Sequence, residues 1–165
     1  MCFVTLISAP SGVDLTRYDS TQVRFVLDET DTAERGCLEN ASVWLLTDAN
    51  GTCSCGFRNV ELPNVQALGF DEPATWSPEE LDDVARSKYV HSVFARLVGA
   101  GDVVDSFTFW NQGVGEVRKL CGTVKVSLSE VDAGRFRFCL LYTSSTNSAP
   151  TTCLAHTYQR TTARP

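Results

Sequence analysis

The sequence predicts an α+β fold: a mainly antiparallel sheet built from hairpins, with one principal α-helix at about residues 78–98 packed on it. Three observations predict this class. Short apolar or alternating segments typical of strands recur along the chain, a hairpin-type turn joins two of them, and one long segment has helical signals. The regular alternation of strands and helices that marks a parallel sheet is missing. With 165 residues, the chain fits one domain of ordinary size.

Strands are predicted on both sides of the helix, from runs of apolar residues or from alternating apolar and polar ones. The predicted strands are segments 2–7, 23–27, 43–47, 52–57, 103–110, 123–128 and 135–142. The clearest turn is Asn50-Gly51, the pair favoured in two-residue type I′ hairpins. A hairpin there puts Trp44, Cys53, Cys55 and Phe57 on one face, which we expect to be buried. A turn at 132–134 predicts a second hairpin, between the last two strands.

The helix is predicted from its ends. Ser77, Pro78 and Glu80 form a capping-box pattern at its start, and Gly99 or Gly101 can end it. Its apolar residues form two stripes on nearly opposite sides, so we expect its second half to be buried all round. Residues 1–142 are predicted to form a single domain, and the Ser/Thr/Pro-rich residues 143–165 a flexible tail.

The charge is unevenly distributed along the chain. The net charge is -6, but residues 1–83 hold 15 acids and 4 bases, whereas residues 84–165 hold 5 acids and 10 bases. An acidic protein repels nucleic-acid backbones, so general nucleic-acid binding is not expected. Opposite charges on the two halves favour attraction within one molecule, between copies in an oligomer, or towards a charged partner.

A basic set on the predicted C-terminal strands is the candidate docking face of this polarised surface. Its partner is then an acidic protein segment or a phosphate-bearing ligand. The set consists of Arg118, Lys119, Lys125, Arg135 and Arg137. The alternative is that acids of the same molecule and the long arginine stems offset these charges.

Seven cysteines without regular spacing, and no secretory signal, predict a cytoplasmic protein with mostly reduced thiols. No apolar run is long enough for a membrane helix. On an extended strand, Cys53 and Cys55 lie roughly 6.5–7 Å apart, more than the ~4 Å between two thiolates on zinc. We therefore expect both to be inert core residues without a cofactor. The alternative is a site for zinc or another soft metal formed with Cys2, and with His91 or Cys37 as the fourth ligand.

The first two residues, Met1-Cys2, carry a further candidate. Removal of Met1 leaves Cys2 with a free α-amine that can act as base for its own thiol. This opening resembles that of class II glutamine amidotransferases, which are N-terminal-nucleophile hydrolases, although Phe3 stands where that family often has glycine or arginine. The resemblance covers two residues and implies an amide hydrolase with Cys2 as nucleophile.

No other set of residues assembles into a catalytic arrangement in the sequence. His91 lies on the predicted helix, and the second histidine, His156, lies in the predicted tail. The sequence therefore favours a small non-catalytic binding or regulatory domain that acts through its charge-polarised surface. The thiolate metal site and the Cys2 hydrolase are the two alternatives.

Overall fold

A computed structural model describes residues 2–30, 33–51, 53–62, 79–111, 119–128, 131–141 and 152–159. In chain order its elements are β1 (Cys2–Ala9), η1 (Leu15–Tyr18), β2 (Val23–Leu27), η2 (Ala33–Cys37), β3 (Ser42–Asp48), β4 (Asn59–Leu62), α1 (Leu81–Ala100), β5 (Val104–Asn111), β6 (Lys119–Ser127), β7 (Phe138–Leu141) and β8 (Thr152–Gln159). Among these residues, no helix is both long enough and apolar enough to cross a lipid bilayer.

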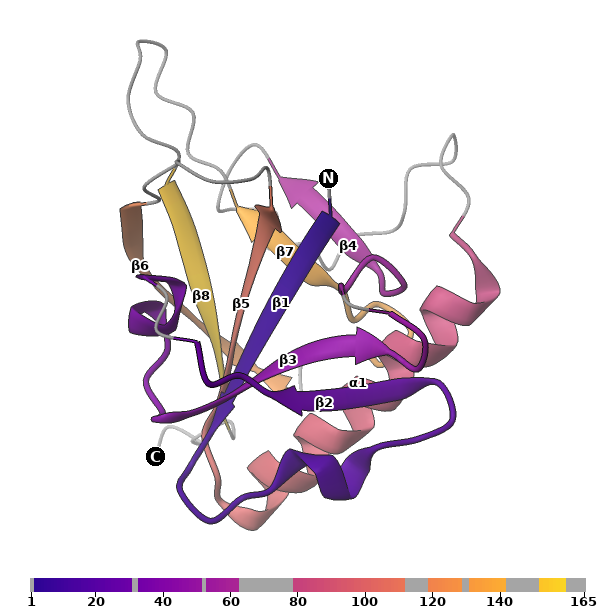
Figure 1. The fold of residues 1–165 in the computed structure, drawn as a ribbon, viewed down its shortest axis with the longest axis horizontal. Coiled ribbons are helices and arrows are strands. Elements are labelled where there is room, and N and C mark those ends of the chain that lie inside the picture. Colours follow the sequence, from indigo (N-terminus) through magenta and orange to yellow (C-terminus); the bar gives the residue numbers. More distant parts are fainter. Residues whose placement is uncertain are drawn as a thin grey trace, which may run out of the picture.

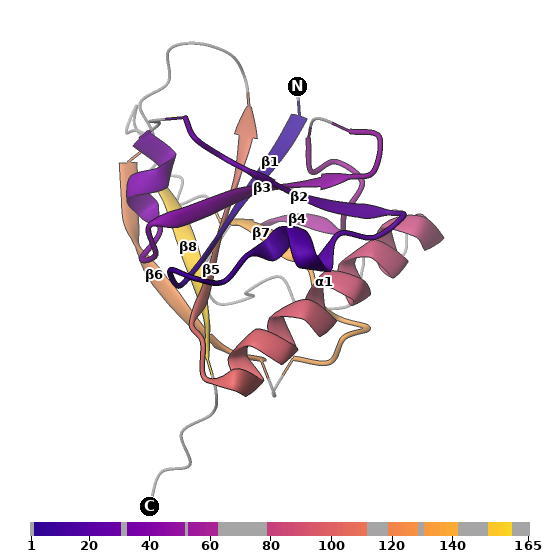
Figure 2. The same cartoon turned by 60° about the horizontal axis from the view of Figure 1, so that its bottom comes forward.

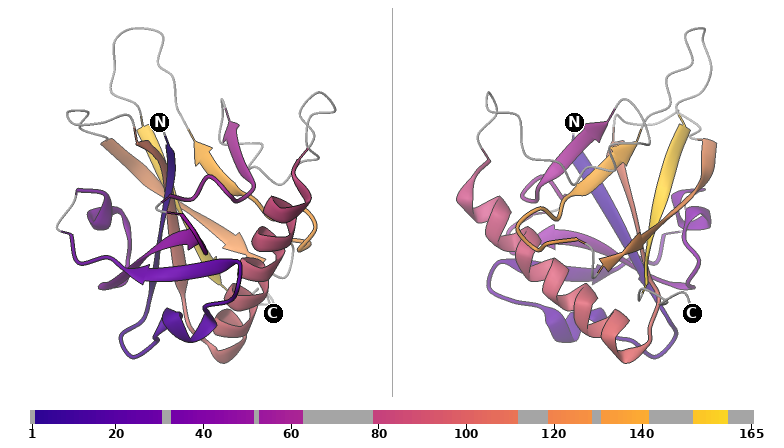
Figure 3. Two further views of the ribbon diagram at one scale, coloured as in Figure 1. Left: turned by 45° about the vertical axis from the view of Figure 1, so that its right-hand side comes forward. Right: turned by 180° about the vertical axis from the view of Figure 1, so that it is seen from behind.

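A six-stranded sheet with the strand order β2-β3-β1-β5-β8-β6 forms the body of the molecule (Figure 1). The pairings from β2 to β8 are antiparallel, and only β6 runs parallel to its neighbour β8. A separate parallel pair, β4 with β7, lies on the same side of this sheet as α1 (Figure 3, left). The predicted α+β class, with a mainly antiparallel sheet and one principal helix packed on it, is confirmed.

Both predicted hairpins are wrong, because the strands pair with more distant segments. β6 pairs with β8, and β7 pairs with β4, so the turn at 132–134 joins two strands that are not neighbours. Residues 143–165, predicted as a flexible tail, contribute β8, which lies between β5 and β6. A strand with neighbours on both sides gains ladder hydrogen bonds on both edges, so threonine-rich composition does not prevent it from forming.

The helix begins at Leu81, later than predicted, with Glu80 as an N-cap that makes no side-chain capping bond. Ser77 lies outside the described residues. The C-terminal prediction is confirmed at Gly101, which has a left-handed φ of 102°. The backbone N–H of Asp102 donates to Leu97 O at 3.0 Å, so the last turn closes as glycine-ended helices commonly do.

Only one face of α1 is buried, so the expected all-round burial is wrong. The buried residues recur at helical spacing on the side that packs against the sheet. They are Ser87, Val90, Val93, Phe94, Leu97 and Val98. Leu81, part of the other predicted stripe, is 85% exposed. The helix covers a sheet on one side and faces solvent on the other, which leaves no second partner for that stripe.

Aromatic rings fill the space between α1 and the strands. Phe136 is fully buried and contacts Phe94 and Phe138 edge-to-face, with ring centroids 6.0 and 5.2 Å apart. The rings of Tyr158, from β8, and Phe94 have centroids 5.0 Å apart, so β8 contributes to the same core. Edge-to-face contacts add about 0.5–1.5 kcal/mol each to the burial of apolar area.

Candidate metal site

The segment after β3 turns back along β1 instead of forming the second strand of a hairpin (Figure 2). Asp48 ends β3 and holds the turn: its side chain accepts from Asn50 N at 3.1 Å, and its carbonyl accepts from Gly51 N at 3.3 Å. β3 already has neighbours on both sides, β1 and β2. No free edge is left for a returning strand, so residues 53–57 adopt turns and bends.

Ser54 fixes this loop at the point where the ladder between β1 and β3 stops. The ladder runs only to the pair Thr5↔Leu46. There the Ser54 hydroxyl accepts from Thr5 N at 2.8 Å and donates to Leu46 O at 2.6 Å, bridging the two strands. Ser54 N also donates to Phe3 O at 2.8 Å. The buried residue of the Cys-Ser-Cys triplet is therefore the serine, with 0% exposure.

The same loop brings three cysteines together. The sulfur atoms of Cys2, Cys53 and Cys55 all lie within 4.8 Å of one another, and none of the three is in a disulfide. Cys2 and Cys53 are partly buried and Cys55 is exposed, so the expected burial of Cys53 and Cys55 as core residues is wrong. The error follows from the predicted hairpin: on an extended strand the two side chains lie roughly 6.5–7 Å apart on one face, whereas in the turn the two sulfurs lie within 4.8 Å of each other.

Hydrogen bonds distinguish the sulfurs from one another. Phe3 N donates to Cys55 Sγ at 3.2 Å. Burial raises the pKa of the Cys55 thiol most, and hydrogen bonding with Cys53 adds to this, so that its pKa is about 11. For Cys53, burial is the largest single influence and raises the pKa. Hydrogen bonds from the Cys55 backbone N–H and from the Cys55 and Cys2 thiols together outweigh burial. The pKa of Cys53 is therefore lowered.

Neither of the proposed fourth ligands lies in this cluster. His91 Nε2 is 3.0 Å from Val131 O, and its ring packs on Phe136 with centroids 5.3 Å apart. Cys37 belongs to η2 and packs against Phe107. In the described ranges, no histidine, aspartate or glutamate joins the three sulfurs. The loop geometry thus assembles three of the five candidate metal ligands and separates the other two.

The arrangement fits one metal ion. Metal–sulfur bonds of about 2.3 Å place two thiolates roughly 3.8 Å apart in tetrahedral geometry and roughly 4.0 Å apart in trigonal geometry. Sulfurs within 4.8 Å of one another reach these separations by small side-chain rotations. Thiolates are the donors that zinc, Cu(I) and other soft ions prefer.

Of the predicted basic docking set, the structure describes the side-chain exposure of Arg135 and Arg137 only. Arg137 is 1% exposed, so its expected place on a docking surface is wrong. Arg135 is exposed, and Lys119 and Lys125 belong to β6. Arg118 lies outside the described residues. The local sequence does not distinguish Arg137 from Arg135, because both precede β7 in a segment of alternating apolar and polar residues.

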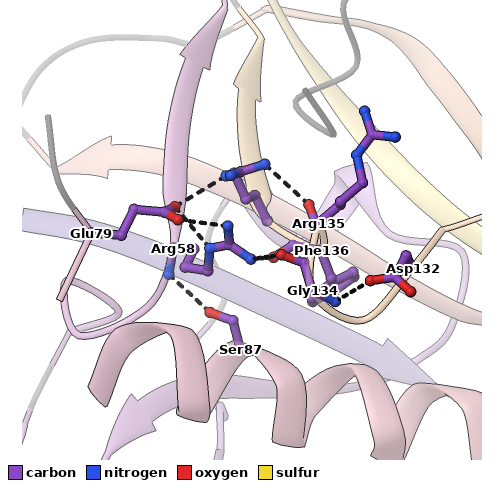
Figure 4. Close-up of polar contacts among 8 residues, drawn as sticks. Arg58, Glu79, Ser87, Asp132, Gly134, Arg135 and Phe136 are labelled. Atoms are coloured by element: carbon purple, nitrogen blue, oxygen red, sulfur yellow. Dashed lines mark hydrogen bonds and ion pairs between the residues drawn. The ribbon is translucent and has the colours of Figure 1, made fainter. Parts of the chain in front are cut away.

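The partners of Arg137 are residues that the sequence did not identify (Figure 4). Glu79 accepts from Arg58 through both carboxylate oxygens, at 2.7 and 2.6 Å, and from Arg137 Nε at 3.1 Å. Arg58 also donates to Gly134 O, and its backbone N–H donates to Ser87 Oγ at 2.9 Å. This ion-pair network joins the segments before α1, β4 and β7, and its residues lie far apart in sequence.

The hydrolase candidate rests on Cys2 and on Met1, and Met1 lies outside the described residues. The thiol of Cys2 lies in the cysteine cluster at the start of β1. No protein-family model matches the chain, and searches of the curated proteins and of the solved structures found no match either.

Proposed function

We propose that this protein binds a single thiophilic metal ion, zinc or another soft metal, through the thiolates of Cys2, Cys53 and Cys55. One observation carries the proposal: three sulfurs from two distant segments lie within 4.8 Å of one another without a disulfide between them. Grouping three thiols at the surface does nothing for the apolar core, since one is exposed and two are only partly buried.

The rigidity of the loop supports the proposal. Ser54 is bonded to both β1 and β3, so the cysteines on either side of it are held before any ion arrives. A site that is already ordered loses little conformational freedom on binding. The Phe3 N–H that points at Cys55 Sγ also favours the thiolate, because a hydrogen bond to the charged form stabilises it.

Metal binding replaces protons on these sulfurs. The thiols must lose their protons to coordinate, so affinity falls as the solution becomes more acidic and binding releases protons. With Zn²⁺, three thiolates leave a fourth position for water or another ligand, because zinc in proteins is almost always four-coordinate.

The test is binding of Co²⁺ and Zn²⁺ to reduced protein purified without chelator, followed by elemental analysis. We expect one ion per chain and a thiolate-to-cobalt charge-transfer band, both lost in Cys53→Ser/Cys55→Ser. Cys37→Ser is the matched control, since Cys37 is also partly buried but lies outside the cluster, and it should bind like the wild type. Wild-type protein that binds no ion, or a double variant that still binds one with the same band, contradicts the proposal.

The other two hypotheses remain predictions. The first is docking of an acidic segment on the polarised surface, to which Arg137 does not contribute because it is buried. Binding of a partner that does not depend on salt concentration would contradict it. An amide hydrolase requires a free Cys2 amine, so an intact mass that includes Met1 contradicts it.

A further inference from the structure

The number of donors in the cluster points to the class of ion it holds. Within the described residues, the site offers three sulfurs and no carboxylate or imidazole. A closed zinc site in proteins has four ligands from the chain, and an open one needs water or substrate as the fourth. Cu(I) is a soft ion for which thiolates are preferred ligands, and three sulfurs complete a trigonal shell around it. This inference rests on the proposed function, since it needs the three cysteines to bind an ion at all.

We propose that the ion is Cu(I), held by Cys2, Cys53 and Cys55 in three-coordinate geometry, with Cys55 as the ligand that is exchanged. All three sulfur pairs lie within 4.8 Å, so one ion can contact the three sulfurs at once, and the described residues add no fourth donor. Small side-chain rotations then place one ion at about 2.3 Å from each sulfur.

Exposure decides which ligand leaves. Cys55 is exposed, whereas Cys2 and Cys53 are partly buried. An incoming thiolate, such as that of a small cellular thiol or of an acceptor protein, approaches copper from the Cys55 side. Its sulfur bonds to copper, the bond between copper and Cys55 Sγ breaks, and Cys55 takes up a proton from solvent. Copper stays Cu(I) throughout, so the step needs no oxidant or reductant.

The backbone helps Cys55 to leave and return. Phe3 N lies 3.2 Å from Cys55 Sγ and continues to donate a hydrogen bond to the released sulfur. Ser54 holds the loop on β1 and β3 during the exchange. The remaining two sulfurs keep the ion on the protein until the acceptor supplies further ligands.

The experiment is a competition between ions and chelators without oxygen and with ascorbate as reductant. Cu(I) is offered as its bathocuproine disulfonate complex to apo-protein and to Zn²⁺-loaded protein. We expect one Cu(I) per chain, displacement of zinc, and an affinity for Cu(I) at least about tenfold above that for Zn²⁺. X-ray absorption at the copper edge should show three sulfur neighbours.

Two variants test the role of Cys55. Cys55→Ser should keep Cu(I) with two sulfur neighbours, bind it at least about tenfold more weakly, and lose the dependence of transfer rate on the concentration of added thiol. Cys37→Ser should behave as the wild type in each assay. Unchanged affinity and transfer in Cys55→Ser would overturn the assignment of the exchanged ligand.

The outcomes separate this inference from the proposed function. Tight binding of Zn²⁺ with Cu(I) bound equally or less tightly overturns the inference and leaves the metal site standing. Four-coordinate copper, with a further donor from the chain, overturns the three-coordinate assignment. Binding of neither ion by the folded, reduced protein contradicts both.

Discussion

At the scale of single residues, Ser54 has more structural influence than the two cysteines beside it. Its side chain is fully buried and connects Thr5 N with Leu46 O, at the end of the ladder between β1 and β3. The hydroxyl both accepts from Thr5 N and donates to Leu46 O. It thus takes the place of a backbone hydrogen-bond partner for each of the two strands. The position of the sulfurs follows from this serine.

Ser54→Ala should therefore destabilise the protein. The change leaves the buried Thr5 N–H without this acceptor, at a cost of about 1–3 kcal/mol in the free energy of unfolding. Urea unfolding measures this, and the affinity for Co²⁺ should fall in the same variant because the loop is no longer fixed. Ser92→Ala is the control, since Ser92 is exposed on α1, and it should change stability little. Equal unfolding curves for Ser54→Ala and the wild type would contradict the role of Ser54.

A second residue-scale prediction concerns Glu79, which is the common partner of two buried arginines. The Arg58 and Arg137 side chains are 3% and 1% exposed in these ion pairs, and Glu79 is 21% exposed. Glu79→Gln removes the countercharge and should cost about 3 kcal/mol, as measured by thermal or urea unfolding. Glu80→Gln, one residue away and exposed, serves as the control. A loss no greater than that of the control would show that the network contributes little.

The same carboxylate predicts a dependence on pH. Hydrogen bonding from Arg58, followed by that from Arg137, lowers the pKa of Glu79 below its ordinary value of 4.5, against the opposing effect of burial. A lowered folded pKa adds stability that is present above the unfolded pKa and is lost as pH falls through the folded pKa. Wild-type stability should thus fall below about pH 4.5, and Glu79→Gln should lose less over that range. Urea unfolding from about pH 6 to about pH 3 compares them; parallel losses would contradict the prediction.

At the scale of elements, the helix and most strands were predictable, but β4, β8 and the pairing of the strands were not, and the predicted strand 52–57 is a loop. Segment 23–27 matches β2, and the helix end at Gly101 follows from backbone geometry that favours glycine. The Asn50-Gly51 pair does form a turn, but nothing local shows that β3 has partners on both sides. Strand partners are chosen by contacts between distant segments, and a single sequence does not display them.

The helix end gives a matched pair of substitutions. Gly101 has φ at 102°, where an alanine is strained, so Gly101→Ala should cost about 1–2 kcal/mol. Gly99 lies within α1 without positive φ and with open space around its Cβ position, so Gly99→Ala should add about 0.5–1 kcal/mol. Melting temperatures of the two variants should move in opposite directions. Shifts of the same sign would contradict the assigned helix end.

At the scale of the whole molecule, the candidate site joins Cys2 of the first strand to the loop that holds Cys53 and Cys55. The sequence analysis included a metal site formed by these three cysteines as an alternative. It preferred buried core positions for Cys53 and Cys55, which depended on a hairpin that does not form. Nothing local predicts that Ser54 replaces a strand partner of β1, because that bond joins residues 49 positions apart. The ion-pair network of Glu79 was missed for the same reason, since its arginines come from separate segments.

The most direct test of the account is protection of thiols by a bound metal. Reduced protein is alkylated with and without one equivalent of Zn²⁺ or Cu(I), and each cysteine is quantified by peptide mass spectrometry. Cys2, Cys53 and Cys55 should be alkylated in the apo-protein and protected together in the loaded protein, while Cys37 should react alike in both. Alkylation of the three cysteines at the same rate with and without metal would contradict it.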